Sequence, residues 1–187
     1  FSLSLTAISW LGYLLLENRF TGRLKLFATL PLAASSYVFG VLIFAILQGT
    51  LGTISMLVAA RVLGVQTNID GIYGISVLAL TVFVALLSLC GISVIIASRV
   101  RSFSEGSLYT DALGAGLVLL APVYYGAETL PDFMRWLGYV LPTTYIAGAV
   151  NKILAGNMFV GGELSILLLM AAITLSGGFW AMNWREE

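Results

Sequence analysis

Residues 17–31, ENRFTGRLKLFATLP, are the one charged and helix-capable stretch between two long apolar runs of this sequence. No charged side chain occurs in residues 1–16, and none occurs in residues 27–60. A polar segment held between two runs that enter a bilayer has to contact either lipid headgroups or a soluble partner. The sequence therefore predicts a membrane protein, and the partner of this segment decides its function.

The composition supports this membrane class. The chain has 187 residues, of which 59% are hydrophobic and 10% are charged, and its mean hydropathy is +1.00, whereas soluble domains carry about 25% charged residues. Nine basic and nine acidic side chains cancel, which gives no sign of a nucleic-acid partner. Cys90 is the single cysteine and histidine is absent, so we expect no metal site and no disulfide within the chain. The absence of GxxxxGK[ST] indicates that this chain holds no nucleotide in a P-loop.

The uncharged runs predict an all-α integral membrane protein, with a single domain over residues 1–187. We expect about five spans, at residues 1–16, 36–60, 72–98, 106–125 and 163–184. A helix needs about 20 apolar residues to cross the hydrocarbon. The first run is shorter than this, so we expect it to be a span that lacks its start.

Two features inside these spans have more than one interpretation. Ala45, Gly49 and Thr53 are four residues apart on one helix face, a small-residue spacing that lets helices approach closely in lipid. Packing within one subunit is the preferred interpretation, and a dimer interface is the alternative. Asp111 is interpreted as an interfacial charge or a charge at a helix N-terminus, with a position facing a pathway through the protein as the alternative.

The region before the last span is broken. From Pro122 on, prolines and glycines interrupt the apolar sequence, and no uncharged run is long enough to span until the last one. Non-helical backbone at membrane depth is tolerated only where it is buried in protein or lines a cavity. We therefore predict re-entrant helices in residues 131–154, at about 132–140 and 143–154, with a threonine of the pair Thr143–Thr144 capping the second.

The distribution of basic residues predicts the orientation. Alternating loops place six basic residues on one side (Arg19, Arg23, Lys25, Arg99, Arg101 and Arg185) and three on the other (Arg61, Arg135 and Lys152). The positive-inside rule then places residues 17–30, the Arg99 loop and the C-terminus in the cytoplasm. The broken region around Pro131 is expected outside.

A helix is predicted over residues 17–30. At about 100° per residue, Phe20, Leu24 and Phe27 share one stripe and polar side chains occupy the opposite side. This pattern is typical of an interfacial helix whose arginines reach the headgroups. It is equally typical of a helix whose polar side docks into a cytoplasmic protein, and periodicity leaves the two open.

Two stretches resemble a known family. Glu17, Gly22, Leu24 and Pro31, followed by YVFG at residues 37–40, are similar to the first cytoplasmic segment of ABC type-2 exporter permeases. The external stretch before the last helix of that family is similar to GAETLP at 126–131, DFMRWL at 132–137 and LPTTY at 141–145. The order and spacing of these motifs agree with a permease from its second helix to its end.

The resemblance implies a six-helix transmembrane subunit, here without its first helix, that is not an enzyme by itself. It implies a plasma-membrane exporter of hydrophobic drug-like or lipid substrates, with a second permease copy, identical or not, and a P-loop ATPase that holds ATP and Mg. A glycan exporter is the alternative, and a non-transporting scaffold is a distant one. Residues implied in ATPase coupling are Glu17, Arg19, Thr21, Gly22, Arg23, Leu24, Lys25 and Phe27. Residues implied in an external gate are Glu128, Pro131, Trp136, Leu137, Pro142 and Tyr145.

Overall fold

The computed structural model describes residues 5–23, 26, 29, 34–64, 69, 71–120 and 132–181. All regular secondary structure in these residues is helical, which confirms the predicted all-α membrane class. The elements are the π-helix η1 (Leu5–Trp10), α2 (Leu11–Phe20), α4 (Ala34–Val62), α5 (Gly71–Arg99), α6 (Phe103–Leu120), α7 (Asp132–Val140), α8 (Pro142–Leu154) and α9 (Gly161–Ala181).

Three of the described helices are long and apolar enough to cross a membrane. They lie at Phe39–Val62, Gly71–Arg99 and Gly161–Gly178. Helices α4 and α5 have 29 residues each, or about 43 Å, which exceeds the roughly 30 Å of hydrocarbon. The described parts of the other two predicted spans are shorter: η1 and α2 together cover 5–20, and α6 is described as far as Leu120.

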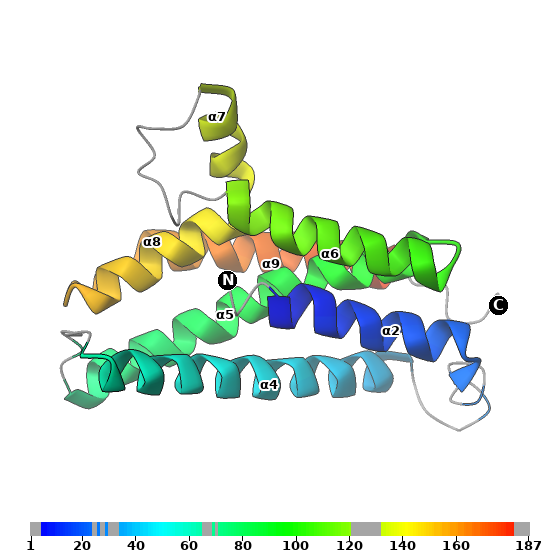
Figure 1. The fold of residues 1–187 in the computed structure, drawn as a ribbon, viewed down its shortest axis with the longest axis horizontal. Coiled ribbons are helices and arrows are strands. Elements are labelled where there is room, and N and C mark those ends of the chain that lie inside the picture. Colours follow the sequence, from blue (N-terminus) through cyan, green and yellow to red (C-terminus); the bar gives the residue numbers. More distant parts are fainter. Residues whose placement is uncertain are drawn as a thin grey trace.

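Helix α5 is the centre of the molecule. It contacts η1, α2, α4, α6, α8 and α9, and 61% of its apolar window is buried, against 22% for α4 and 17% for α9. Figure 1 shows α4 and α5 extending along the length of the molecule, with α2 and α6 side by side toward one end and α8 toward the other. The end of α2, the start of α4, the end of α5 and the start of α6 therefore meet at one end of the bundle.

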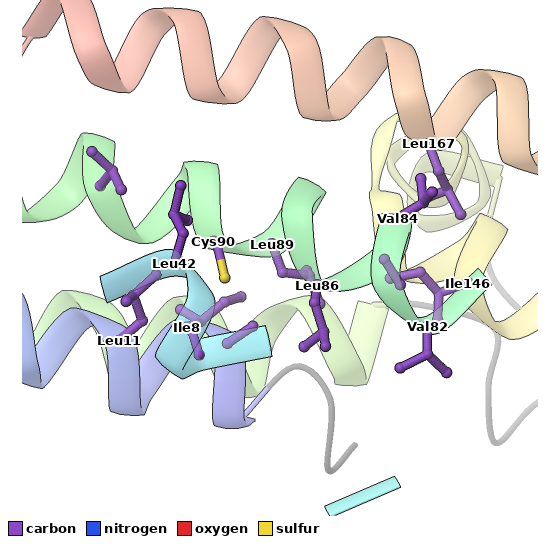
Figure 2. Packing of buried hydrophobic residues seen from close by; sticks show 14 of the residues in the cluster. Ile8, Leu11, Leu42, Val82, Val84, Leu86, Leu89, Cys90, Ile146 and Leu167 are labelled. Carbon is purple, nitrogen blue, oxygen red and sulfur yellow. The ribbon is translucent and has the colours of Figure 1, made fainter. Parts of the chain in front are cut away.

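The core lies on two sides of α5 (Figure 2). On one side, buried side chains of η1, α2 and α4 meet those of α5: Ile8, Leu11, Leu42, Leu86, Leu89 and Cys90. On the other side, Val84 lies with Ile146 of α8 and Leu167 of α9. Because buried side chains pack against α5 on both sides, a displacement of α5 would change its packing against the helices around it.

Small residues set the distance between α4 and α5. Ala45 is buried, and a Cβ added to Gly49 would lie 2.5 Å from Cδ2 of Leu86 on α5. Such a contact is too short for any side chain larger than glycine. The small-residue face of α4 therefore packs within the chain, as its preferred interpretation predicted.

A second close approach joins α2 to the first half of α6. A Cβ on Gly12 would lie 2.4 Å from Cγ2 of Thr110, and a Cβ on Gly106 would lie 2.5 Å from Cδ2 of Leu16. Gly106, Thr110 and Gly114 are four residues apart, so they form one face of α6 against η1 and α2. The two helices are thereby held at the distance that glycine permits.

The short helices α7 and α8 lie where half-length helices were expected, but the predicted threonine cap was wrong. Leu141 is the N-cap residue of α8, in an extended conformation and without a side-chain cap, and Pro142 begins the helix. Proline suits this position because its φ is already helical. The Thr143 hydroxyl instead donates to the carbonyl of Leu117 on α6 at 2.8 Å, and the Thr144 hydroxyl to that of Gly138 on α7 at 2.6 Å.

Candidate functional site

The polar segment that follows α2 is the candidate site, and its structure corrects the predicted helix over residues 17–30. Helix α2 ends at Phe20, and the backbone N–H of Thr21 donates to the carbonyl of Glu17. Gly22 then has φ +77°, a left-handed conformation that glycine adopts without a steric penalty and that ends helices. Helical geometry resumes at Arg23 and Leu26. Glu17 therefore belongs to the end of the membrane helix α2.

One side of the end of α2 is anchored inside the bundle. The Asn18 side chain is 7% exposed, and its Nδ2 donates to the hydroxyl of Tyr37 on α4 at 2.9 Å. Nη1 of Arg19 donates to the carbonyls of Ala97 and Val100 at 2.7 and 3.0 Å. Carbonyls at a helix C-terminus lack partners within the helix and attract cations. Asn18 and Arg19 thus tie α2 to the start of α4 and the end of α5.

The other side of this segment faces outward. Glu17 and Arg23 form an ion pair of 3.2 Å across the Gly22 turn, with side chains 48% and 59% exposed. Phe20 and Leu26 are exposed hydrophobic residues, and Thr21 is exposed between them. We call this surface, made of Glu17, Phe20, Thr21, Arg23 and Leu26, the docking face.

The docking face combines two kinds of contact that suit a protein partner. Its exposed ion pair contributes under about 1 kcal/mol and is easily exchanged for contacts with another chain, while its aromatic and aliphatic side chains offer apolar area. Three of the predicted coupling residues, Leu24, Lys25 and Phe27, lie outside the described residues. Arg19 was also predicted to be a coupling residue, but its side chain points into the bundle.

The turn between α5 and α6 lies at the same end of the bundle as the docking face. From the sequence it was predicted only as a basic loop. Oγ of Ser102 accepts a hydrogen bond from the N–H of Glu105 at 3.2 Å. In return, Oε2 of Glu105 accepts one from the N–H of Arg101 at 3.0 Å. This arrangement is a close variant of a capping box, in which both side chains satisfy the free N–H groups of a helix start. The S-x-x-E spacing of residues 102–105 could have predicted it.

The predicted gate residues divide between α7, α8 and the undescribed part of the chain. Pro142 is buried at the start of α8 and Leu137 of α7 is half-buried, whereas Trp136 is 76% exposed. The Tyr145 hydroxyl donates to the carbonyl of Tyr139 at 2.8 Å. Glu128 and Pro131 lie outside the described residues. The structure thus fastens α8 to α7 and leaves the aromatic side of α7 uncovered.

An ion pair closes the contact between α8 and α9. Nζ of Lys152 binds Oε1 of Glu163, at the end of the molecule opposite to the docking face (Figure 1). Within the described residues, no three side chains of histidine, cysteine, aspartate or glutamate gather as a metal site would require.

Comparison with known proteins adds a family. A family model described as ABC-2 type transporter matches residues 1–154, which is most of the chain. No curated protein and no solved structure matches it. The permeases of this family are membrane subunits that generally pair with an ATPase and are arranged as dimers. Together with its apolar helices, the match shows that this chain belongs to the ABC-2 type transporters and is a multi-pass membrane permease of an ABC exporter.

Proposed function

We propose that this permease moves a hydrophobic drug-like or lipid substrate outward across the plasma membrane, driven by P-loop ATPases bound to the docking face. The family supports the transporter class, and the apolar helices of the chain indicate a pathway within the bilayer, where an apolar cargo dissolves. A second permease copy completes the transporter, and ATP and Mg bind to the ATPases. The observation that carries the proposal is the two-sided end of α2, exposed on one side and tied to the bundle on the other.

The ties at the end of α2 give the ATPase a path into the membrane. Force on the docking face moves the end of α2, and Arg19 and Asn18 transmit the movement to α5 and α4. Because α5 also contacts α8 and α9, the movement reaches the helices at the far end. A ligand shifts a conformational equilibrium only by contacts that differ between the two states, so the docking face has to change its contacts during ATP hydrolysis.

Orientation follows from charge. Arg19 and Arg99 lie in the last turns of α2 and α5, Arg23 follows α2 and Arg101 precedes α6, so these four arginines belong to the docking end, which the positive-inside rule assigns to the cytoplasm. Helices α7 and α8 then belong to the outer part, where they seal the exit of the pathway. The hydrogen bonds from α8 to α6 and α7 support this role, because they hold α8 as a plug against both neighbours.

A glycan exporter of the same architecture is the second candidate. The exposed rings of Trp136 and Tyr139 on α7 favour it, because aromatic side chains provide apolar faces on which sugar rings stack. Returning the gene to cells that lack the permease distinguishes the two functions. A glycan exporter restores glycan at the cell surface, whereas a drug or lipid exporter lowers the cellular content of its apolar substrate.

Two glycines provide a matched test of the docking face. Gly22 and Gly64 have φ +77° and +81°, and nothing lies within 4 Å of a Cβ added to either. Gly22→Asp places a strained, charged residue within the docking face, and Gly64→Asp places the same residue beyond the opposite end of α4. We expect permease-dependent ATP hydrolysis, measured with the co-purified ATPase in liposomes, to fall about tenfold or more for Gly22→Asp only. Equal hydrolysis in both variants would contradict the proposal.

A further inference from the structure

Asp111 lies deeper in the molecule than its sequence position suggested. Helix α6 begins at Phe103, and Glu105 is the acidic residue of its first turn. Asp111 follows eight residues after the start, or about 12 Å along the axis. The interpretation of Asp111 as a helix N-terminal charge is therefore wrong. Its carboxylate is exposed on the surface of the described chain.

The neighbouring helix brings a hydroxyl to this carboxylate. The Tyr13 hydroxyl donates to Oδ2 of Asp111 at 2.5 Å. Tyr13 lies seven residues before the end of α2 at Phe20, so both residues lie at a similar depth from the docking end. The glycine contacts between α2 and α6, one turn from this pair, hold the two helices close enough for the hydrogen bond.

The depth of the pair places it in the hydrocarbon region. Helix α5 exceeds the roughly 30 Å hydrocarbon by about 13 Å. With α5 centred across the hydrocarbon, about 6 Å of helix extends beyond it at each end. Since α6 begins next to the end of α5, Asp111 lies roughly 6 Å inside the boundary. A charged side chain at such depth is costly in lipid and almost always faces protein or a water-filled cavity. The face of α2 and α6 that carries Asp111 therefore does not face acyl chains.

Among the described residues, no basic side chain forms an ion pair with this carboxylate. Arg23 pairs with Glu17 and Lys152 pairs with Glu163, whereas the group that contacts Asp111 is the Tyr13 hydroxyl. Tyr13 supplies one hydrogen bond, which leaves the other oxygen and the negative charge without a partner among the described residues. An uncompensated carboxylate in a low-dielectric setting attracts a cation strongly.

The surroundings are apolar and aromatic. The ring of Tyr13 lies 6.2 Å from that of Phe103, and Leu108 of α6, three residues before Asp111 and on the same side of the helix, is exposed. Aromatic faces attract cations, and exposed leucines accept the apolar part of a ligand. The chemistry that fits is a cation attached to an apolar body.

We propose that Asp111 and Tyr13 form a binding site for the cationic group of an amphiphilic substrate within the membrane. The inference rests on the proposed export function and narrows its substrate class to lipophilic cations. Asp111 supplies the charge, the Tyr13 hydroxyl fixes the carboxylate, and the two rings and Leu108 receive the apolar part. A neutral or anionic compound of the same shape lacks the attraction to Asp111 and is discriminated against.

Two probes of equal shape and opposite charge test the site. The full-length permease is placed in nanodiscs of neutral phosphatidylcholine, and binding of tetraphenylphosphonium and tetraphenylborate is measured above that of protein-free nanodiscs. We expect Asp111→Asn to weaken the phosphonium by about tenfold and to leave the borate unchanged or tighter. Asp132→Asn, which removes a carboxylate from α7, is expected to change neither.

A second variant keeps the test decisive. Tyr13→Phe removes the hydroxyl that orients Asp111 and is expected to weaken the phosphonium by about threefold, while Tyr109→Phe, on another side of α6, has no effect. If Asp111→Asn does not assemble, unchanged phosphonium binding in Tyr13→Phe overturns the proposal. Unchanged phosphonium binding in Asp111→Asn also overturns it. The proposal is also overturned if Asp111→Asn loses the permease dimer in light scattering while each folded chain still binds the phosphonium. Asp111 would then serve the contact between the two permease copies.

The outcomes separate this inference from the exporter proposal. The binding measurement contains no ATPase, so its failure leaves the comparison of Gly22→Asp with Gly64→Asp intact. Conversely, both glycine variants could keep normal permease-dependent ATP hydrolysis. That result would show that the docking face is not the ATPase contact, and it would leave the affinity for the phosphonium unchanged.

Discussion

The docking end of this bundle and the opposite end, which we propose is the outer end, are held together by different interactions. At the docking end, part-buried hydrogen bonds cross between helices: Asn18 binds Tyr37, and Arg19 binds the carbonyls of Ala97 and Val100 at the end of α5. At the outer end, α8 is fastened by the Thr143 hydroxyl and an exposed ion pair, and α7 leaves Trp136 uncovered. Buried polar ties are costly to break and exposed pairs are not. Both ends contain such hydrogen bonds, but only the outer end joins two of its helices through an exposed pair and leaves an aromatic side of a helix uncovered, so we expect the outer end to rearrange more readily.

The largest loss of stability is expected where α6 packs closely against α2. In Gly106→Leu, a Cβ would lie 2.5 Å from Cδ2 of Leu16, so the side chain forces α2 and α6 apart. Overpacking of this kind costs about 1–3 kcal/mol, and we expect the melting temperature in detergent to fall by roughly 2–12 °C. Gly148→Leu is the matched control at the outer end, because nothing lies within 4 Å of a Cβ there. A similar fall in both variants would remove the contrast between the ends.

The matched cations at the two ends test the ties directly. Arg19→Met leaves the carbonyls of Ala97 and Val100 without their donor, at a cost of about 1–3 kcal/mol, and detaches α5 from the docking face. We expect a lower melting temperature together with a loss of permease-dependent ATP hydrolysis. Lys152→Met removes an exposed pair worth under about 1 kcal/mol and should leave hydrolysis near the unsubstituted level. Intact coupling in Arg19→Met would show that α5 is not driven through this residue.

A smaller effect is expected from the threonines that hold α8. Thr143→Val keeps the shape of the side chain but removes the buried hydrogen bond to Leu117 of α6, which is worth about 1 kcal/mol. Export should slow or leak while assembly with the ATPase is retained. Thr144→Val removes a half-buried bond to Gly138 of α7 and is the companion variant. Unchanged export in both would mean that α8 does not seal the pathway.

The smallest change in stability is expected at Trp136. Its side chain is 76% exposed on α7, so Trp136→Ala removes little buried area, and its stability should change by less than about 0.5 kcal/mol. Export is the informative measurement for this variant. A slower export with an unchanged melting temperature places Trp136 at the gate, whereas a large loss of stability shows that the aromatic side of α7 is covered in the complete transporter.

The helices were predictable because charge and helix breakers mark their ends. Charge-free runs located α4 and α5, since they follow Lys25 and Asp70 and end at Arg61 and Arg99, and Pro142 separated α7 from α8. The break at Gly22 was missed because the apolar stripe continues through it, and a stripe reports periodicity rather than the φ of one residue. Its signal was the glycine itself, at the position where a helix C-terminus favours one.

The partners of the polar side chains were not predictable. Arg19 binds carbonyls about 80 residues away along the chain, and Tyr13 meets Asp111 only because α2 and α6 lie side by side. Hydropathy assigns such residues to a depth but not to a face, since rotation of the helix is set by packing against its neighbours. The spacing of Gly106, Thr110 and Gly114 was a readable sign of that packing, and it would have turned this face of α6 toward another helix.

The central claim is that the docking face is the surface that the ATPase grips. A photoreactive benzoylphenylalanine in place of Phe20 tests it in the transporter purified with its ATPase, and the same residue in place of Trp136 on the exposed side of α7 is the control. We predict that irradiation joins the permease to the P-loop ATPase from position 20 and not from position 136, with a yield that changes between the ATP-bound and nucleotide-free states. An ATPase adduct from position 136, or none from position 20, would contradict the account.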